Sequence, residues 1–361
     1  MLDPGSELAG GRGALVVDVC GGRSWCVRSA GLWLVWGFVV ALVSPAGASE
    51  FSTPSLFSPS STPAHGIAEY SHLVLGICLL IFTVVMGLIA VVTVRYRVRP
   101  GDDGREPPQI YGSNQLELAW TVIPGIIVFI LALVTVRTIL ALQVEERPEG
   151  WMPVTAVGHQ WWWEFHYPEH GFTTANELHL PAGRATFLTL QSADVIHSFW
   201  VPQLAGKTDV IPNHENQMWV EPERPGLFVG QCAEFCGMQH ANMLLRVVVH
   251  EEQDFQRWAR AQAQDAAALP AVAEGREVFL RTACINCHTV RGTAANGRFG
   301  PDLTHLMSRE TLGSGMIPND ARNLRAWVED PEHYKPGARM PAMGLNDRKL
   351  DALVQYLASL E

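Results

Sequence analysis

Two short cysteine clusters carry most of the chemistry that this sequence offers. In the first, Cys232 and Cys236 are separated by three residues, and His240 and Met243 follow closely. A further histidine, His197, lies upstream in the run DVIHSFW. Two thiolates, two imidazoles and a thioether form a soft ligand set that selects copper among the first-row metals. Because both sulfurs lie on one loop and can bridge two ions, with one histidine for each, the sequence predicts a dinuclear copper site.

Two other interpretations of the Cys232 and Cys236 pair stay open at this point. A disulfide is a common state for a cysteine pair in an oxidising compartment. A lone zinc site is the second, although methionine is a poor ligand for zinc. The nearby His240 and Met243 favour copper over both alternatives.

The second cluster, Cys284–His288, reads C-x-x-C-H, which is typical of c-type heme attachment. Its two thiols can add to the vinyl groups of heme while the histidine reaches the iron. The alternatives are a thioredoxin-like pair and half of a zinc site. A distal ligand is expected from the run YKPGARMPAM, where Met340 is the candidate, and a His/Met pair would raise the iron potential. Methionine more often packs than ligates, and the nearby rivals are Met307, Met316 and Met343.

The whole-chain numbers limit the kinds of protein that could position these clusters. The chain has 361 residues, which indicates two or three domains. Charged residues make up 17% and hydrophobic ones 48%, a balance that points to membrane segments. The net charge of −10 argues against nucleic acid as a partner and would suit a basic protein partner. The seven cysteines do not resemble a disulfide framework, because four of them lie in the two clusters.

The N-terminal region has the pattern of a secretory leader. Arg23 and Arg28 precede an apolar core at Leu32–Val43, and small residues follow as far as Ala48. We therefore expect residues 1–48 to be a signal peptide that is cut after Ala48. A third membrane helix is the alternative, although this apolar run is short for a span.

Two longer apolar stretches, Leu73–Val94 and Leu118–Val136, are each long enough to cross a bilayer. They predict a transmembrane hairpin over residues 65–145. The connector between them contains four arginines and should be cytoplasmic by the positive-inside tendency; these are Arg95, Arg97, Arg99 and Arg105. Everything after Arg137 then lies outside the cytoplasm, as the leader also requires.

Three further segments follow the hairpin. Residues 150–250 contain short β-rich runs separated by turn residues, which is typical of a β-sandwich or barrel. The runs expected to form strands include Thr186–Leu190, Met218–Val220 and Leu244–Val249. Residues 251–271 are expected to form a short helix and then a linker. Residues 272–361 form a separate unit, with helical spacing in Val272–Arg281 and Leu350–Leu360.

These motifs together resemble cytochrome c oxidase subunit II over residues 65–250. The resemblance rests on CAEFCGMQHANM at Cys232–Met243 and on four further runs in the same order: NQLELAWTVIP, GHQWWW, DVIHSFW and KTDVIP. Residues 272–361 resemble a class I cytochrome c, as in the fused subunits of caa3-type oxidases. The resemblance implies a multidomain membrane protein: a two-helix transmembrane hairpin, a cupredoxin-like β-barrel and an all-α cytochrome c domain.

The resemblance also assigns roles to single residues. The copper ligands would be His197, Cys232, Cys236, His240, Met243 and the backbone carbonyl of Glu234. The Glu234 side chain would help to bind a magnesium ion shared with subunit I. Trp161 would be an exposed ring through which electrons enter, and Asp209 an acid near that docking face or simply a solvated one. Glu117 would lie at the entry of a proton route, unless it is merely solvated at the membrane boundary.

One departure from the family pattern concerns a turn. Asn213 and His214 stand where the family often has Gly-Arg. The turn remains feasible because asparagine tolerates unusual backbone angles, but the partner contact of the missing arginine is in doubt.

The function implied is electron transfer into a respiratory oxidase of a bacterial inner membrane, with the C-terminal domains on the periplasmic side. Electrons would pass from heme c through the dinuclear copper to heme a of subunit I, where heme a3 and copper B reduce oxygen and protons are pumped. Further expected partners are subunit III, membrane lipid and a donor such as a cytochrome c or bc1 complex. The rival functions are the electron-input subunit of a nitric oxide reductase and a membrane-anchored copper-delivery protein. A quinol oxidase subunit would lack the copper ligands.

Overall fold

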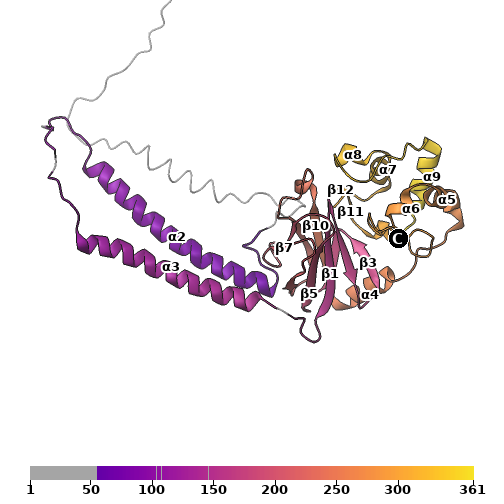
Figure 1. The fold of residues 1–361 in the computed structure, drawn as a ribbon, viewed down its shortest axis with the longest axis horizontal. Coiled ribbons are helices and arrows are strands. Elements are labelled where there is room, and N and C mark those ends of the chain that lie inside the picture. The colour runs from indigo at the N-terminus through magenta and orange to yellow at the C-terminus, as the bar shows by residue number, and fades with distance from the viewer. Residues whose placement is uncertain (1–54, 103, 107, 145) are drawn as a thin grey trace, which may run out of the picture. The chain divides into compact units, whose positions relative to one another are not determined.

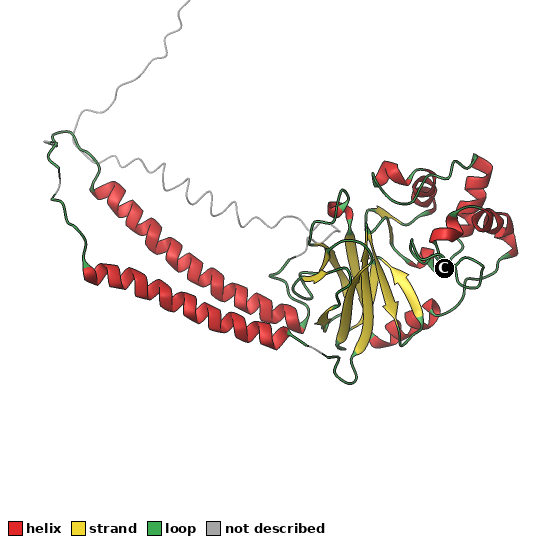
Figure 2. Cartoon of the chain, in the orientation of Figure 1, coloured by secondary structure: helices red, strands yellow, loops and turns green. Residues whose placement is uncertain are grey.

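The computed structural model describes residues 55–361 except 103, 107 and 145. The expected signal peptide at 1–48 lies outside the described residues. Within them, the chain forms two long helices, two five-stranded sheets and a C-terminal group of short helices (Figures 1 and 2).

The two long helices contain the apolar stretches that were expected to cross the membrane. Helix α2 runs over Thr62–Arg95 and α3 over Asn114–Leu142, and both are long and apolar enough to span a bilayer. Each helix extends past its apolar stretch at both ends. Oη of Tyr70 in α2 lies 2.6 Å from Oγ1 of Thr135 in α3, so the two helices pair near one end of the hairpin.

The region between Met152 and His250 folds into two five-stranded sheets, ordered β3-β2-β1-β5-β8 and β4-β10-β9-β6-β7. The pairs β1 with β5 and β4 with β10 are parallel, and the other neighbours are antiparallel. The strands expected from the sequence lie in β5, β8 and β10. The bounds are β1 Met152–His159, β2 Trp162–Tyr167, β3 Phe172–Ala175, β4 Glu177–Pro181, β5 Thr186–Ser192, β6 His197–Trp200, β7 Thr208–Val210, β8 Asn216–Val220, β9 Gly226–Cys232 and β10 Leu244–His250.

Aromatic rings fill the space between these sheets. Alternation along β2 sends Trp163, Phe165 and Tyr167 inward, where all three are buried. Phe199 of β6 meets Trp163 and Phe165 edge-on, with ring centroids 5.5 and 6.5 Å apart. The Trp163 ring also lies 6.1 Å from that of His197, so this core supports one side of the copper ligand set.

Helix α4 (Glu252–Gln262) closes one end of the sheets. It buries Phe255 and Ala259, and the ring of Trp258 stacks on His179 at 4.1 Å. Nδ1 of His179 in turn lies 2.8 Å from Nε2 of His250. The helix and strands β4 and β10 are thus joined by a stack of three rings, of which His179 is buried and the other two are partly buried.

The expected linker after α4 is packed rather than extended. The Ala266 amide donates to the Arg291 carbonyl at 3.1 Å, and Nε2 of His305 donates to the Gln264 carbonyl at 3.0 Å. These bonds fix the linker along the C-terminal unit.

The C-terminal unit consists of short helices around one apolar core. Helix α5 (Ala273–Arg281) crosses α9 (Asp347–Leu357) where Gly275 meets the Ala352 backbone, and a Cβ there would clash. Asn346 caps α9, which therefore starts three residues before the expected Leu350. The other elements are η2 Pro270–Val272, α6 Cys284–Cys287, η3 Leu306–Ser308, β11 Thr311–Leu312, β12 Ile317–Pro318, α7 Ala321–Glu329 and α8 Pro331–Tyr334.

Candidate copper and heme sites

The five predicted copper side chains lie together at one end of the β-domain. The sulfurs of Cys232 and Cys236 are 3.8 Å apart, so they do not form a disulfide in this structure. Nδ1 of His197 lies 3.9 Å from Cys232 Sγ. Nδ1 of His240 and Sδ of Met243 lie 3.7 and 3.8 Å from Cys236 Sγ. Strand β9 ends at Cys232 and η1 (His240–Asn242) holds the second histidine, so two strands and one loop supply the set.

The ring of His197 is held in one orientation. Its Nε2 donates to Oδ1 of Asp194 at 2.8 Å, which leaves Nδ1 to face the sulfurs. Gly158 gives the ring room, because a Cβ there would lie 2.9 Å from Cδ2 of His197. Burial lowers the pKa of His197, but hydrogen bonds with Asp194 and Cys232 outweigh it, and the pKa is raised overall.

The electrostatics of the two sulfurs fit a cationic ligand. A hydrogen bond from Cys236 and a further one from His197 outweigh burial and lower the pKa of Cys232 to about 3. The negative sulfur of Cys232 in turn raises the pKa of Cys236 above its ordinary range, with burial adding to the effect. A metal cation between the sulfurs would favour the second thiolate as well. The donor set therefore fits a copper pair, and the Glu234 carbonyl, 3.2 Å from Cys232 Sγ, fits as a further ligand.

Trp161 lies directly over the copper loop. Its Nε1 donates to the Cys236 carbonyl at 3.0 Å, and Nε2 of Gln160 donates to the same oxygen at 2.8 Å. The ring is half-buried, so the expectation of an exposed ring is wrong. The reason is the segment around Gly337, where a Cβ would stand 3.8 Å from Cη2 of Trp161.

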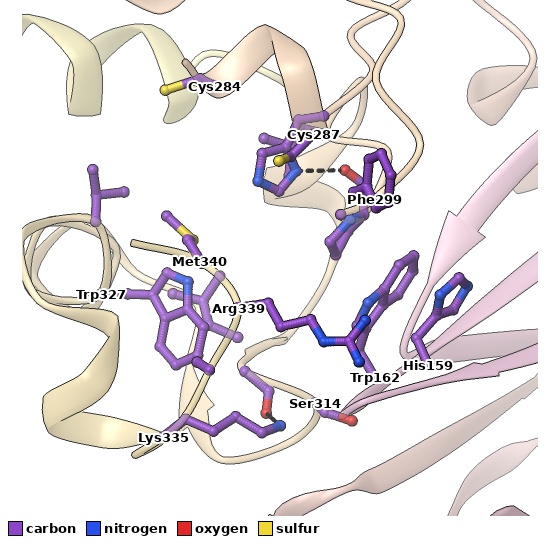
Figure 3. A pocket seen from close by; sticks show the side chains of 18 of the residues that line it. His159, Trp162, Cys284, Cys287, Phe299, Ser314, Trp327, Lys335, Arg339 and Met340 are labelled. Carbon is purple, nitrogen blue, oxygen red and sulfur yellow. Dashed lines mark hydrogen bonds between the residues drawn. The ribbon is translucent and has the colours of Figure 1, made fainter. Parts of the chain in front are cut away.

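The C-x-x-C-H motif borders a cavity of about 550 Å³. Cys284 and Cys287 lie at the top of Figure 3, and Met340 reaches the cavity from a separate segment. Nδ1 of His288 donates a hydrogen bond to the Pro301 carbonyl at 2.8 Å. This bond fixes the ring and leaves Nε2 as the nitrogen that could ligate iron. Burial lowers the pKa of His288, so its neutral, ligating form is favoured.

Two further observations fit a heme in this cavity. Gly300 approaches the His288 ring so closely that a Cβ would lie 2.6 Å from Cε1. Arg309 lines the cavity and is buried, and among the described residues its Nε has no hydrogen-bond partner. An anionic group of a ligand would satisfy it, as the carboxylates of heme can.

The methionine rivals are separated by position. Met340 and Met343 line the cavity, whereas Met307 and Met316 are not among its lining residues. Met340 also packs against the buried core of the C-terminal unit. The geometry therefore narrows the predicted distal ligand to Met340 and Met343.

None of the remaining predicted residues belongs to a ligand set, although Asp209 stands opposite Ser198, the neighbour of His197, in the paired strands β6 and β7. Glu117 is in the first turn of α3, and Asp209 is in β7. Asn213 has a φ of 59°. This left-handed backbone conformation is one that glycine adopts readily in a turn and that asparagine also tolerates.

Sequence reasoning gave no role to Asp194, Arg309, Lys335 or Glu177. The spacing of three residues between Asp194 and His197 was the one sequence signal that could have indicated their contact. Arg309, Lys335 and Glu177 make their contacts with residues far away in the sequence.

Three family models match the chain. They are the transmembrane domain of cytochrome c oxidase subunit II at residues 51–138, its periplasmic domain at 170–251, and cytochrome c at 272–361.

Two relatives agree with these matches in sequence. The chain is 36% identical to cytochrome c oxidase subunit 2 of Alkalihalophilus pseudofirmus, over 81% of this chain and 87% of that protein. It is 34% identical to the subunit of the same name from Bacillus sp. PS3, over 74% of this chain and 80% of that protein. Among solved structures, the periplasmic domain of subunit II of the Bradyrhizobium japonicum oxidase is 30% identical, with a TM-score of 0.31, over 32% of this chain and 95% of that one.

Proposed function

The chain belongs to the cytochrome c oxidase subunit II family, and from that premise we propose that its two cysteine clusters hold the redox groups of an electron relay. As a subunit of a heme-copper terminal oxidase it passes electrons from its cytochrome domain, through its copper domain, to subunit I. The oxidation of donor and the reduction of oxygen make the complex an oxidoreductase, although the oxygen chemistry belongs to subunit I.

The single observation that carries this proposal is the convergence of the copper ligand set. The proposed ligands of the copper pair are His197, Cys232, Cys236, His240, Met243 and the Glu234 carbonyl. The proposed heme ligands and attachment points are Cys284, Cys287, His288 and Met340. A copper pair and a heme bound at these residues would each carry one electron at a time.

The protein residues act by fixing positions before an electron arrives. Asp194 orients His197, and the Pro301 carbonyl orients His288. Both cysteines of the copper loop are buried, which keeps water from the sulfurs. Ligands that do not move on reduction lower the reorganisation that electron transfer requires.

The tip of the copper loop is a candidate contact with subunit I. Phe235 and Met238 are 76% and 74% exposed, an unusual state for two large apolar side chains. Glu234 directly precedes Phe235 on this loop. We propose that its side chain faces a magnesium ion shared with subunit I, because it lies on the copper loop beside the exposed Phe235.

Further partners follow from the hairpin and the orientation of the chain. Helices α2 and α3 are proposed to lie in lipid of the bacterial inner membrane, beside subunit I and subunit III, with the arginine-rich connector in the cytoplasm. A cytochrome c or bc1 complex is the proposed external donor. Trp161 is proposed as the internal electron entry to copper, and Glu117 as a group at the mouth of a proton route. Nothing in the comparisons favours a nitric oxide reductase or a copper-delivery protein.

Purification of the tagged chain from its native membrane tests the proposal. We expect a large heme a-bearing subunit to co-purify, along with c-type heme on this chain. Isolation of the chain without a heme-bearing partner, or with a partner that contains only b-type heme, would reject it.

A further inference from the structure

The cytochrome domain contacts the copper domain through two segments that come together in space, residues 310–314 and 335–340. Ser314 Oγ donates to the Leu244 carbonyl at 2.6 Å, and Nε2 of Gln239 donates to the Pro336 carbonyl at 2.8 Å. Lys335, Arg339, Ser314 and Trp162 all line the cavity, to which both domains contribute (Figure 3). The second segment leads directly to Met340.

Lys335 places a buried amine at the centre of this contact. The residue is 4% exposed. Its Nζ donates to the carbonyls of Trp161 at 2.6 Å and of Asn242 at 2.9 Å, both in the copper domain. A third bond, at 2.9 Å, reaches the Gly313 carbonyl of its own domain. Burial lowers the pKa of Lys335 to about 7, which reflects how completely the docked segment removes this amine from solvent.

Glu177 is the counterpart on the other domain. It lies in β4 of the copper domain and is 1% exposed. Its carboxylate accepts hydrogen bonds from the amides of Glu310 and Thr311 at 3.0 Å each, and from Oγ1 of Thr311 at 3.0 Å. Arg246 provides a charged neighbour, with its Nε 3.7 Å from Oε1 of Glu177.

The two contacts are reciprocal. Each domain contributes one buried ionisable side chain, and the other domain supplies backbone groups that bond to it. Separation of the domains would remove these partners from both side chains and from the backbone groups at once. A buried group that loses its hydrogen bonds is strongly destabilised unless water replaces them, so the two contacts should open together.

We propose that Lys335 and Glu177 form an interdomain lock that holds the cytochrome domain on the copper domain in one orientation. Both are positioning residues, and neither is a predicted metal or heme ligand. Lys335 lines the heme cavity, and its bonds to the carbonyls of Trp161 and Asn242 fix the segment before Met340 on the copper domain. The fused cytochrome is then a docked donor and not a freely moving tethered one. This inference rests on the proposed function, because it concerns the path between the same two sites.

The unmodified protein provides the first test. Electron–electron dipolar spectroscopy between the oxidised copper site and the ferric heme measures the distribution of distances between them. The lock predicts one narrow distribution in the isolated full chain. A broad distribution would overturn it. If the copper or heme signal itself is missing, the proposed function fails instead, and the second test still decides on the lock.

Hydrogen exchange of Lys335→Met provides the second test. Peptides that cover Glu310 and Thr311 should exchange about tenfold faster, because their segment loses the bond from Lys335 to Gly313 and the contact at Glu177 loosens with it. Lys349→Met, at an exposed lysine of α9, should leave that exchange unchanged. Glu177→Gln should in turn speed exchange in peptides covering residues 238–243. The Glu177→Gln arm decides, because the printed partners of the Glu177 carboxylate are Glu310, Thr311 and Arg246 and none lies in residues 238–243. Unchanged exchange of residues 238–243 in that variant would overturn the lock.

Discussion

The carboxylate of Asp194 holds the ring of His197: Oδ1 accepts from Nε2 across 2.8 Å, so that only Nδ1 faces the copper loop. Asp194 is itself fixed, because its Oδ2 accepts a hydrogen bond from the backbone amide of Gln160 at 2.7 Å. Arg339, the neighbour of Met340, lies 3.7 Å from the same oxygen. The Asp194 carboxylate therefore contacts His197, a predicted copper ligand, and Arg339, which precedes the predicted heme ligand Met340.

Asp194→Asn should weaken copper binding without unfolding the domain. The amide keeps an acceptor for Nε2 but loses the charge that favours a fixed, basic imidazole, and loss of such a partner typically costs about 10- to 100-fold in metal affinity. Competition with a chelator measures this. Asp209→Asn is the control, because Asp209 lies outside the ligand set. Equal affinity in Asp194→Asn and the wild type would contradict the assigned role.

Cys232→Ser should abolish the copper pair and spare the heme. A hydroxyl is a far weaker ligand than the thiolate that is favoured at this position, and the C-x-x-C-H motif that would hold the heme lies in the other domain. Metal analysis together with the optical spectrum separates the two effects. Cys78→Ser, at an exposed cysteine of α2, should keep both groups. Retention of two copper ions in Cys232→Ser would show that the ligand set is wrong.

Met340→Leu should lower the reduction potential of the heme. Loss of the thioether removes the ligand that raises the potential, and axial ligands shift it by on the order of 0.1 V or more. Met343→Leu is the matched control, because both side chains line the cavity. A redox titration of each variant decides; a shift in Met343→Leu alone would transfer the assignment to that residue.

The stability of the copper domain should fall as the pH drops below about 6.5. Burial, then the neighbouring His250 and Arg309, lower the pKa of His179 well below its ordinary value of 6.5. Since the unfolded chain binds this proton more readily, stability is complete above pH 6.5 and is lost as pH falls toward the folded pKa, by up to about 1.4 kcal/mol per pH unit.

His179→Phe should flatten that pH dependence, because it keeps a ring to stack on Trp258 and cannot take up a proton. Denaturant unfolding at several pH values measures the slope, with His214→Gln, at an exposed histidine, as the control. An unchanged slope in His179→Phe would assign the acid sensitivity to another group.

The local parts of both sites could be predicted from sequence, because their spacing is itself the chemistry. Cys232 to Met243 is a single loop, and Cys284 to His288 is a single turn of helix. The apolar lengths likewise predicted α2 and α3, and short β-rich runs between turn residues predicted the strands β5, β8 and β10.

The rest depended on contacts between distant segments. Trp161 was expected to be exposed, but Lys335 and Gly337, more than 170 residues later in the chain, cover it. Glu177 and Lys335 look like ordinary surface charges in the sequence, and only the docked domains bury them. No local pattern encodes such partners.

A low-temperature electron spin resonance spectrum of the purified oxidised chain, recorded with its optical spectrum, tests the central claim most directly. We predict a copper signal whose hyperfine pattern shows one unpaired electron shared by two nuclei, together with the absorption bands of a c-type heme. A copper signal confined to one nucleus, or a spectrum without c-type heme, would contradict the account of this chain as an electron relay with its donor built in.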